Sequence, residues 1–311
     1  MKFAIRWILA VVTMKKQTGT SLVKMLALAL SIACTQSAPA QTFKHVNVKG
    51  GAALVQIASG GVSVWARASN GNPYILKGKQ FVLANSISLT QIAVGGGNAF
   101  QADAVWGLDS SGLIYRAAKS GTIWTFSQVP GLLDFIVVGI GYQDSCHPYE
   151  VWGLNPSANI YRYNFCGQNF EQIAGTLGTL AVGGGTILGI NGNGEVFWFD
   201  FKTLAFEKYT SFGFKQVAVG PNDAWALNSD SVVINLFFQF GTLVPGNVQL
   251  TQIQAGGNGL WAIGSSQQIF RLEPTDLFVQ IPGALVSISV GSGGGVWGID
   301  SSGKAYAFST P

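Results

Sequence analysis

The sequence predicts an all-β protein, and three observations support this prediction. Of the 311 residues, 48% are hydrophobic, only 10% are charged and 41 are glycine. Residues that favour strands and turns, such as Val, Ile, Phe, Gly, Ser and Asn, outweigh the Glu, Lys and Arg of long helices. The phrase VWGLDSSGLIYR at 105–116 returns as VWGLNPSANIYR at 151–162. Such a repeat indicates an architecture of repeated units.

The repeat occurs seven times along the chain. Each copy has an anchor residue equivalent to the Trp of VWG, and an apolar, mostly aromatic residue follows nine positions later. An apolar run that ends in glycine, such as QIAVG or FIVVG, precedes each anchor. The anchors are Trp65, Trp106, Trp152, Leu188, Trp225, Trp261 and Trp297.

Each unit divides into four short strands. The apolar run forms the first strand, the VWGL segment the second and the IYR segment the third. The fourth is the segment before a Pro-Gly or Gly turn, such as TFSQVPG at 125–131. Turn residues such as DSSG (109–112) and NGNG (191–194) separate the second and third strands, because Asp, Asn, Ser and Gly accept tight-turn geometry. We therefore expect antiparallel hairpins.

Four antiparallel strands in each unit are typical of a β-propeller blade, which buries its faces only against neighbouring blades. We predict seven four-stranded blades, with six as the alternative because the fourth and fifth units have diverged. The last unit ends after its third strand, while TFKHVNVKGG at 42–51 resembles a fourth strand. We expect this N-terminal strand to complete the last blade and close the ring.

The repeat resembles the tectonin β-propeller repeat, in which V-W-G-[ILV]-[DN] and G-x-[IV]-[YF]-R follow an I-A-V-G strand. The resemblance covers about residues 42–309. It is clear in the second and third copies and weaker in the fourth (ILGINGNGEVFW) and fifth (AWALNSDSVVIN). It implies a secreted or surface lectin that recognises exposed glycans, including O-methylated sugars. Tectonin lectins usually have six blades, so the count of seven departs from the family pattern.

Residues 1–40 have the features of a signal peptide. Lys15, Lys16 and Lys24 form a basic region before the apolar run MLALALSIA, and Ala-Pro-Ala at 38–40 supplies a cleavage site. The run is too short to span a bilayer. We therefore expect a single propeller domain over 41–311 in a secreted or periplasmic protein.

Two alternatives remain open at this end of the chain. Cys34 lies near the place of a lipid-attachment cysteine, so the protein can instead be lipid-anchored. Met14 can be the true start, since two lysines follow it directly.

The net charge of +4 does not indicate a nucleic-acid partner. Five of the eighteen basic residues and none of the fourteen acidic ones lie in the first forty positions. The remaining 13 basic and 14 acidic residues nearly cancel. The charge pattern therefore excludes the basic surface of a nucleic-acid binder.

Cysteine and histidine usage favours a disulfide and no metal or cofactor. Cys146 and Cys166 are the two cysteines beyond the leader, and we expect them to pair in an oxidising compartment. His45 and His147 are the only histidines, too few for a typical zinc site.

Two long loops supply the main candidate site. The anchor lies eleven positions after the first-strand glycine in unit two (95–106) and thirteen positions after it in unit three (139–152), against five in four of the other units. Loops on a rigid scaffold often bind ligands, and these two should be neighbours on one face. The alternative is that they are plain surface loops. The candidate ligand contacts are Asn98, Gln101, Asp103, Tyr142, Gln143, Asp144, His147, Tyr149 and Glu150.

Four repeat residues are further ligand candidates. Trp106 and Trp152 can stack on a sugar, although anchors repeated in every blade suit a core role equally well. Arg116 and Arg162 can donate to sugar oxygens, or they can lie on an outer strand with packed stems.

No catalytic constellation is recognisable. The acids lie scattered in turns without a paired arrangement, and two histidines give no Ser-His-Asp pattern. We predict a non-enzymatic, glycan-binding propeller. The alternative is a protein-interaction or adhesion scaffold at the cell envelope. The repeat pattern does not indicate whether the protein is a monomer or an oligomer.

Overall fold

The computed structural model describes residues 42–141, 144–210, 213–238, 241–242, 246 and 248–309. The predicted signal peptide, Cys34 and both possible start residues lie outside this range. All regular elements of the described residues are strands, which lie in one compact unit. No helix in this part of the chain is long and apolar enough to cross a membrane.

The strands form five four-stranded sheets and one eight-stranded sheet. We number the blades by their first strands, so that blade 1 starts at β2 and blade 7 at β26. Blades 1 to 3 contain β2 (Leu54–Ser59), β3 (Val64–Ala68), β4 (Pro73–Lys77), β5 (Gln80–Leu83), β6 (Gln91–Gly95), β7 (Ala104–Leu108), β8 (Leu113–Ser120), β9 (Ile123–Leu132), β10 (Phe135–Gly139), β11 (Glu150–Leu154), β12 (Asn159–Asn164) and β13 (Asn169–Thr176).

The later blades repeat the same order. Blades 4 to 6 contain β14 (Thr179–Gly183), β15 (Thr186–Ile190), β16 (Val196–Asp200), β17 (Ala205–Thr210), β18 (Phe214–Val219), β19 (Ala224–Asn228), β20 (Val233–Asn235), β21 (Gly241–Thr242), β22 (Leu250–Gly256), β23 (Gly259–Gly264), β24 (Gln268–Leu272) and β25 (Phe278–Ala284). Blade 7 contains β26 (Ser287–Val290), β27 (Val296–Ile299), β28 (Ala305–Ser309) and β1 (Thr42–Val48).

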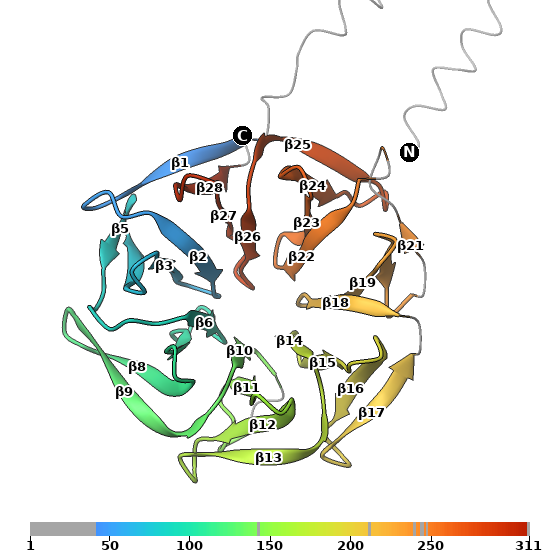
Figure 1. Ribbon diagram of the computed structural model, residues 1–311, viewed down its shortest axis with the longest axis horizontal. Coiled ribbons are helices and arrows are strands. Elements are labelled where there is room, and N and C mark those ends of the chain that lie inside the picture. The colour runs from blue at the N-terminus through green and yellow to red at the C-terminus, as the bar shows by residue number, and fades with distance from the viewer. Residues whose placement is uncertain are drawn as a thin grey trace, which may run out of the picture. The chain divides into compact units, whose positions relative to one another are not determined.

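The blades stand in a ring around a central channel, with the first strand of each blade innermost (Figure 1). The eight-stranded sheet consists of blades 1 and 7, which β1 and β5 join edge to edge. The all-β propeller prediction is therefore confirmed, and the strand order fits seven blades rather than six.

The N-terminal strand closes the ring, as the sequence predicted. β1 pairs antiparallel with β28, from Thr42↔Ser309 to Val46↔Ala305. Its end also pairs in parallel with β5, at Asn47↔Gln80 and the following position. The first strand of the described chain thus completes the last blade and leaves neither β5 nor β28 as a free edge.

In blades 2, 3, 4, 5 and 7 the hairpin between the second and third strands is held by the Asp or Asn at its start. In blade 2, Asp109 Oδ1 accepts hydrogen bonds from the amides of Ser111 at 2.8 Å and Leu113 at 3.0 Å. Gly112 then takes a φ of 76°, in the left-handed region that glycine adopts readily. In this way the turns that begin with Asp or Asn hold the register of these five hairpins.

The anchor tryptophans lie between the blades. Trp65, Trp106, Trp152 and Trp261 are each 0% exposed. Each packs edge to face on an aromatic ring of the following blade, and the ring centroids are 4.6–4.7 Å apart. The structure therefore corrects Trp106 and Trp152 from ligand contacts to core residues, because no ligand can reach their buried rings.

Glutamines of the QIAVG-type strands connect neighbouring blades across the channel wall. Gln91 Nε2 donates to the carbonyl oxygen of Ile136 at 2.9 Å, and Ile136 N donates to Gln91 Oε1 at 3.0 Å. Gln56, Gln216 and Gln252 make the same bidentate contact with Ile92, Ile253 and Ile288. The glutamines line the channel, whose volume is about 370 Å³. This role of the glutamines was not predicted from the repeat pattern.

Replacing Gln91 with Ala should reduce the free energy of unfolding by about 1–3 kcal/mol, because the Ile136 amide and carbonyl lose their partner. Gln254→Ala is the matched control, since Gln254 also lines the channel but makes no such clamp. Urea unfolding of both variants gives the comparison. Equal stability of the two variants would contradict a clamping role for Gln91.

Candidate functional site

The two long loops contact one another at one end of the channel, as predicted. Tyr149 donates its hydroxyl to the carbonyl oxygen of Ala102 at 2.9 Å. Gln101 Nε2 donates to the carbonyl oxygen of Pro148 at 3.4 Å. A Cβ at Gly96 would lie 2.2 Å from Cδ1 of Tyr149, so this glycine allows the tyrosine ring to pack against the backbone. Gln101 and Tyr149 thus join loop 96–103 to loop 140–149.

Asp103 fastens loop 96–103 to blade 1. Its Oδ1 accepts hydrogen bonds from the amides of Gly61 at 2.7 Å and Gly97 at 2.8 Å. Its Oδ2 accepts from the amide and hydroxyl of Ser63, both at 2.7 Å, and from the amide of Val62 at 3.1 Å. Five donors occupy this carboxylate, so the structure corrects Asp103 from a ligand contact to a clamp between loops.

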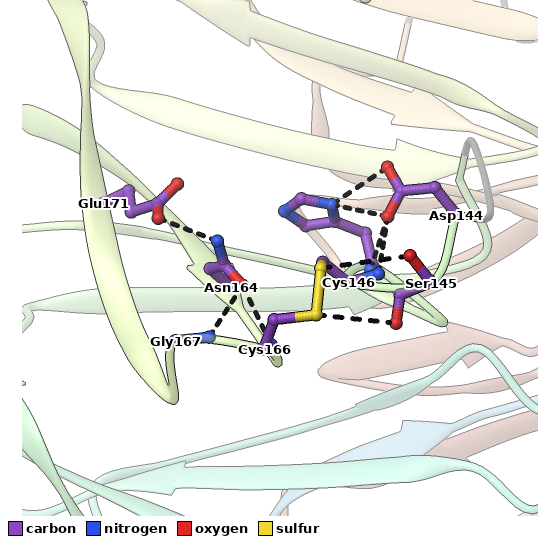
Figure 2. The surroundings of a disulfide bond; sticks show 8 residues. Asp144, Ser145, Cys146, Asn164, Cys166, Gly167 and Glu171 are labelled. Carbon is purple, nitrogen blue, oxygen red and sulfur yellow. Dashed lines mark hydrogen bonds and ion pairs between the residues drawn. A yellow bond between two sulfur atoms is a disulfide. The ribbon is translucent and has the colours of Figure 1, made fainter.

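The predicted disulfide is present. Cys146 and Cys166 are bonded, with their Cα atoms 5.0 Å apart. Figure 2 shows that the bond joins the segment after Asp144 to the turn between β12 and β13. The amide of Phe165 also donates to the carbonyl oxygen of Cys146 at 2.9 Å. The bond cross-links the longer loop to its own blade.

Asp144 and His147 interact with one another inside this loop. Asp144 Oδ1 accepts hydrogen bonds from the amides of Cys146 and His147, both at 2.8 Å, and contacts His147 Nδ1 at 2.9 Å. Partial desolvation tends to raise the pKa of Asp144, but the His147 imidazole and the two amides outweigh it and hold this pKa below its ordinary value. Both residues therefore shape the loop.

Glu150 and Arg162 form a buried ion pair. Glu150 is 0% exposed, and its carboxylate accepts from Arg162 Nη2 at 2.6 Å and Nε at 2.9 Å. It also accepts from the indole Nε1 of Trp152 at 2.7 Å. Because these groups satisfy one another between blades 3 and 4, the structure corrects both Glu150 and Arg162 from ligand contacts to core residues.

Phe100 is the side chain that these clamps present to solvent. It is 100% exposed, and its amide donates to Asn98 Oδ1 at 2.8 Å in a tight turn closed by the Asn98↔Gln101 bridge. Val62, in the blade 1 loop held by Asp103, is 56% exposed. Phe100 was not among the predicted ligand contacts, although an aromatic residue in the middle of an inserted loop was a usable signal.

A hollow of about 430 Å³ lies beside this turn at the mouth of the channel. It is wide and mostly built from backbone and small side chains. Its lining residues are Gly61, Gly97, Asn98, Ala99, Ile140, Gly184, Pro221, Ser292 and Gly293. Of the predicted ligand contacts, Asn98 alone lines the hollow, Arg116 is exposed elsewhere on blade 2, and Tyr142 and Gln143 lie outside the described residues.

No cluster of three or more His, Cys, Asp or Glu side chains that can hold a metal ion occurs among the described residues. The site consists instead of an exposed aromatic ring, an amide, a hydroxyl and small apolar groups. Such a surface can stack on, and hydrogen-bond to, a neutral ligand.

The tectonin domain model matches residues 40–214 and 213–310, which is most of the chain. The chain belongs to the tectonin domain family. No curated protein shows significant sequence similarity to it. The family assignment confirms the resemblance that the repeat indicated.

Solved structures agree on the fold of this tectonin-domain protein. A YCF48 protein bound to a D1 peptide superposes with a TM-score of 0.64 at 12% identity, covering 88% of this chain and all of its own. The Neurospora crassa Pan2 WD40 domain gives 0.60 at 12% identity, covering 84% of this chain and 90% of its own. Human WBSCR16 gives 0.58 at 11%, covering 83% and 86%. At these identities the likeness concerns the fold alone.

The lowered pKa of Asp144 leads to a titration test. A carboxylate whose pKa is lower in the folded state stabilises the loop above the ordinary value of 3.8, and this stabilisation is lost as the pH falls through the folded value. His147→Ala should move the Asp144 midpoint upward, toward 3.8, in an NMR titration of side-chain carboxyls. His45→Ala, at the other histidine, should leave it in place. An unchanged midpoint in His147→Ala would contradict the assigned contact.

Proposed function

We propose that this protein is an exported, non-catalytic carbohydrate-binding propeller that holds its ligand over the channel mouth. The observation on which the proposal rests is the fully exposed Phe100, presented by a turn whose base is fixed by Asp103. An exposed aromatic ring would normally cost free energy in water, so a braced one suits a ligand with an apolar face.

The surroundings of Phe100 match the chemistry of a sugar. A pyranose ring has an apolar C–H face that stacks on an aromatic ring, while its hydroxyls need hydrogen-bonding partners. Asn98 and Ser292 offer such partners at the hollow, and the small residues beside them leave room for a methylated oxygen. The tectonin family assignment supports an O-methylated sugar as one ligand of this kind.

The leader and the disulfide support export. Residues 1–40 have the features of a cleaved signal, and the Cys146–Cys166 bond would be stable in an oxidising compartment. Glycans are exposed at cell surfaces, so export would bring the loop face to its ligands.

A protein-interaction role is the second candidate. One of the structurally similar propellers is a YCF48 protein bound to a D1 peptide. The exposed apolar residues Val62 and Phe100 can also serve as contacts for apolar peptide side chains. Competition by free sugar separates the two roles. Free sugar should displace a bound glycan, but it should not displace a peptide from a protein-binding site.

Phe100→Ala should weaken glycan binding about tenfold or more, because stacking on the ring is lost while the fold is untouched. The mature chain from residue 41 is first screened on a glycan array that includes O-methylated sugars, and affinities for the best ligand are then measured by calorimetry. Leu132→Ala is the control, since Leu132 is also exposed but lies at the end of β9, away from the hollow.

Three outcomes separate the hypotheses. Binding that free sugar competes away and that Phe100→Ala alone removes would support the lectin role at this site. Binding that both variants retain would place the sugar elsewhere. A blank array with folded protein would contradict the lectin role and favour the protein-interaction role.

A further inference from the structure

Three blades contain a Trp–Arg pair with the same geometry. In each pair the two residues face one another across the second and third strands, and the guanidinium carbon lies 5.6–5.9 Å from the centre of an indole ring. The pairs are Trp106↔Arg116 in blade 2, Trp152↔Arg162 in blade 3 and Trp261↔Arg271 in blade 6. The repeat thus places two sets of donors, an indole N–H and a guanidinium, side by side three times.

In blades 3 and 6 these donors have acceptors. The Glu150 carboxylate accepts from both Trp152 Nε1 and the Arg162 guanidinium. In blade 6 the indole of Trp261 donates to the carbonyl oxygen of Asn258 at 3.3 Å. The guanidinium of Arg271 lies 3.7 Å from a carboxylate oxygen of Glu273.

Blade 2 has the donors but lacks the carboxylate. Ala104 occupies the position in the repeat that Glu150 occupies in blade 3, two residues before the anchor tryptophan. Trp106 is completely buried, and its Nε1 has no acceptor among the described residues. Arg116 is exposed and makes no ion pair with any carboxylate in the described part of the chain. The exposed Arg116 guanidinium therefore lacks the carboxylate that Glu150 supplies to its counterpart in blade 3.

Stacking holds the Arg116 guanidinium ready for an anion. Its carbon lies 5.0 Å from the centre of the Phe165 ring, and such stacking leaves the in-plane N–H donors free for a planar bidentate partner. Phe165 precedes the disulfide-bonded Cys166 and packs against Tyr149, with their ring centroids 5.9 Å apart. The cation is therefore fixed to the structure that braces loop 140–149.

We propose that Arg116 forms a carboxylate subsite, so that the glycans bound by this protein include acidic sugars held through their carboxylate. The inference rests on the proposed glycan binding and adds a class of ligand to it. The carboxylate accepts from the edge of the Arg116 guanidinium, in the role that Glu150 performs for Arg162. No bond is made or broken, and the subsite adds affinity and specificity only.

The test compares acidic probes with their carboxyl-reduced counterparts. The probes are an oligogalacturonate, a glucuronoxylan fragment and sialyllactose, and calorimetry of the mature chain gives the affinities. We expect at least one acidic probe to bind about tenfold or more tightly than its reduced form. Arg116→Gln should abolish that difference and leave the affinity for the reduced form unchanged.

Lys119→Gln is the matched control. Lys119 lies on the same strand, is also exposed and also has its cationic nitrogen near an aromatic ring, 5.9 Å from the centre of Trp124. Because both variants lose one positive charge, a specific subsite predicts that only Arg116→Gln loses the acid preference. If both variants lose the acid preference equally, the preference depends only on net charge and the proposal is overturned.

A second variant tests the subsite without removing the cation. Ala104→Glu places a carboxylate where blade 3 has Glu150, and it should occupy Arg116 internally and remove the acid preference. Thermal melting verifies that each variant is folded. Retained acid preference in folded Ala104→Glu and Arg116→Gln would overturn the proposal.

The remaining outcomes distinguish this proposal from the proposed function. If the acidic and reduced forms bind equally, the subsite is wrong and the glycan-binding role stands. If no sugar binds but a polyglutamate peptide does so through Arg116, both sugar proposals fail and the acceptor is a protein carboxylate.

Discussion

The contact between neighbouring blades is the interaction on which the rest of this structure depends. A single four-stranded blade cannot bury both of its faces, so each blade is stable only against the next. Trp65, Trp106 and Trp152 fill these junctions by packing on aromatic rings of the following blade. A buried tryptophan of this kind is worth about 3–5 kcal/mol, far more than any single surface contact. Leu188 fills the fourth junction with a smaller side chain.

A ring of such contacts must close, and β1 provides the closure. Its pairing with β28 brings Phe43 against Trp261, with ring centroids 5.9 Å apart, so the N-terminal strand also fills part of a junction. Inside the ring, the glutamine clamps hold neighbouring first strands together. The scaffold therefore keeps the first strands at fixed positions, and the loops that follow them meet at the channel mouth.

The features that repeat could be predicted from the sequence, because each copy supports the same assignment. The four strands, the anchors and the role of residues 42–51 all follow from the period. The Cys146–Cys166 bond was predictable because two cysteines remained beyond a leader that has the features of a signal peptide. Phe100 was missed, although its place in the middle of an insertion made it visible.

The roles of the loop carboxylates could not be predicted in the same way. Asp103 finds its donors at Gly61 and Ser63, some forty positions away in another blade. Glu150 meets Arg162 only because β11 and β12 place them together between blades 3 and 4. An acidic residue in a long loop has the same appearance in a sequence whether it meets a ligand or an internal donor. The contrast between Glu150 and Ala104 became informative only once the structure showed which donors each one faces.

Hydrogen–deuterium exchange of the mature chain, with and without a glycan selected on the array, tests whether the ligand binds at the channel mouth. The glycan should slow exchange in residues 96–103 and 140–149 and leave the turns at the opposite end of the blades unchanged. Protection confined to that opposite end, or to the outer strands away from blades 2 and 3, would contradict a binding face at the channel mouth.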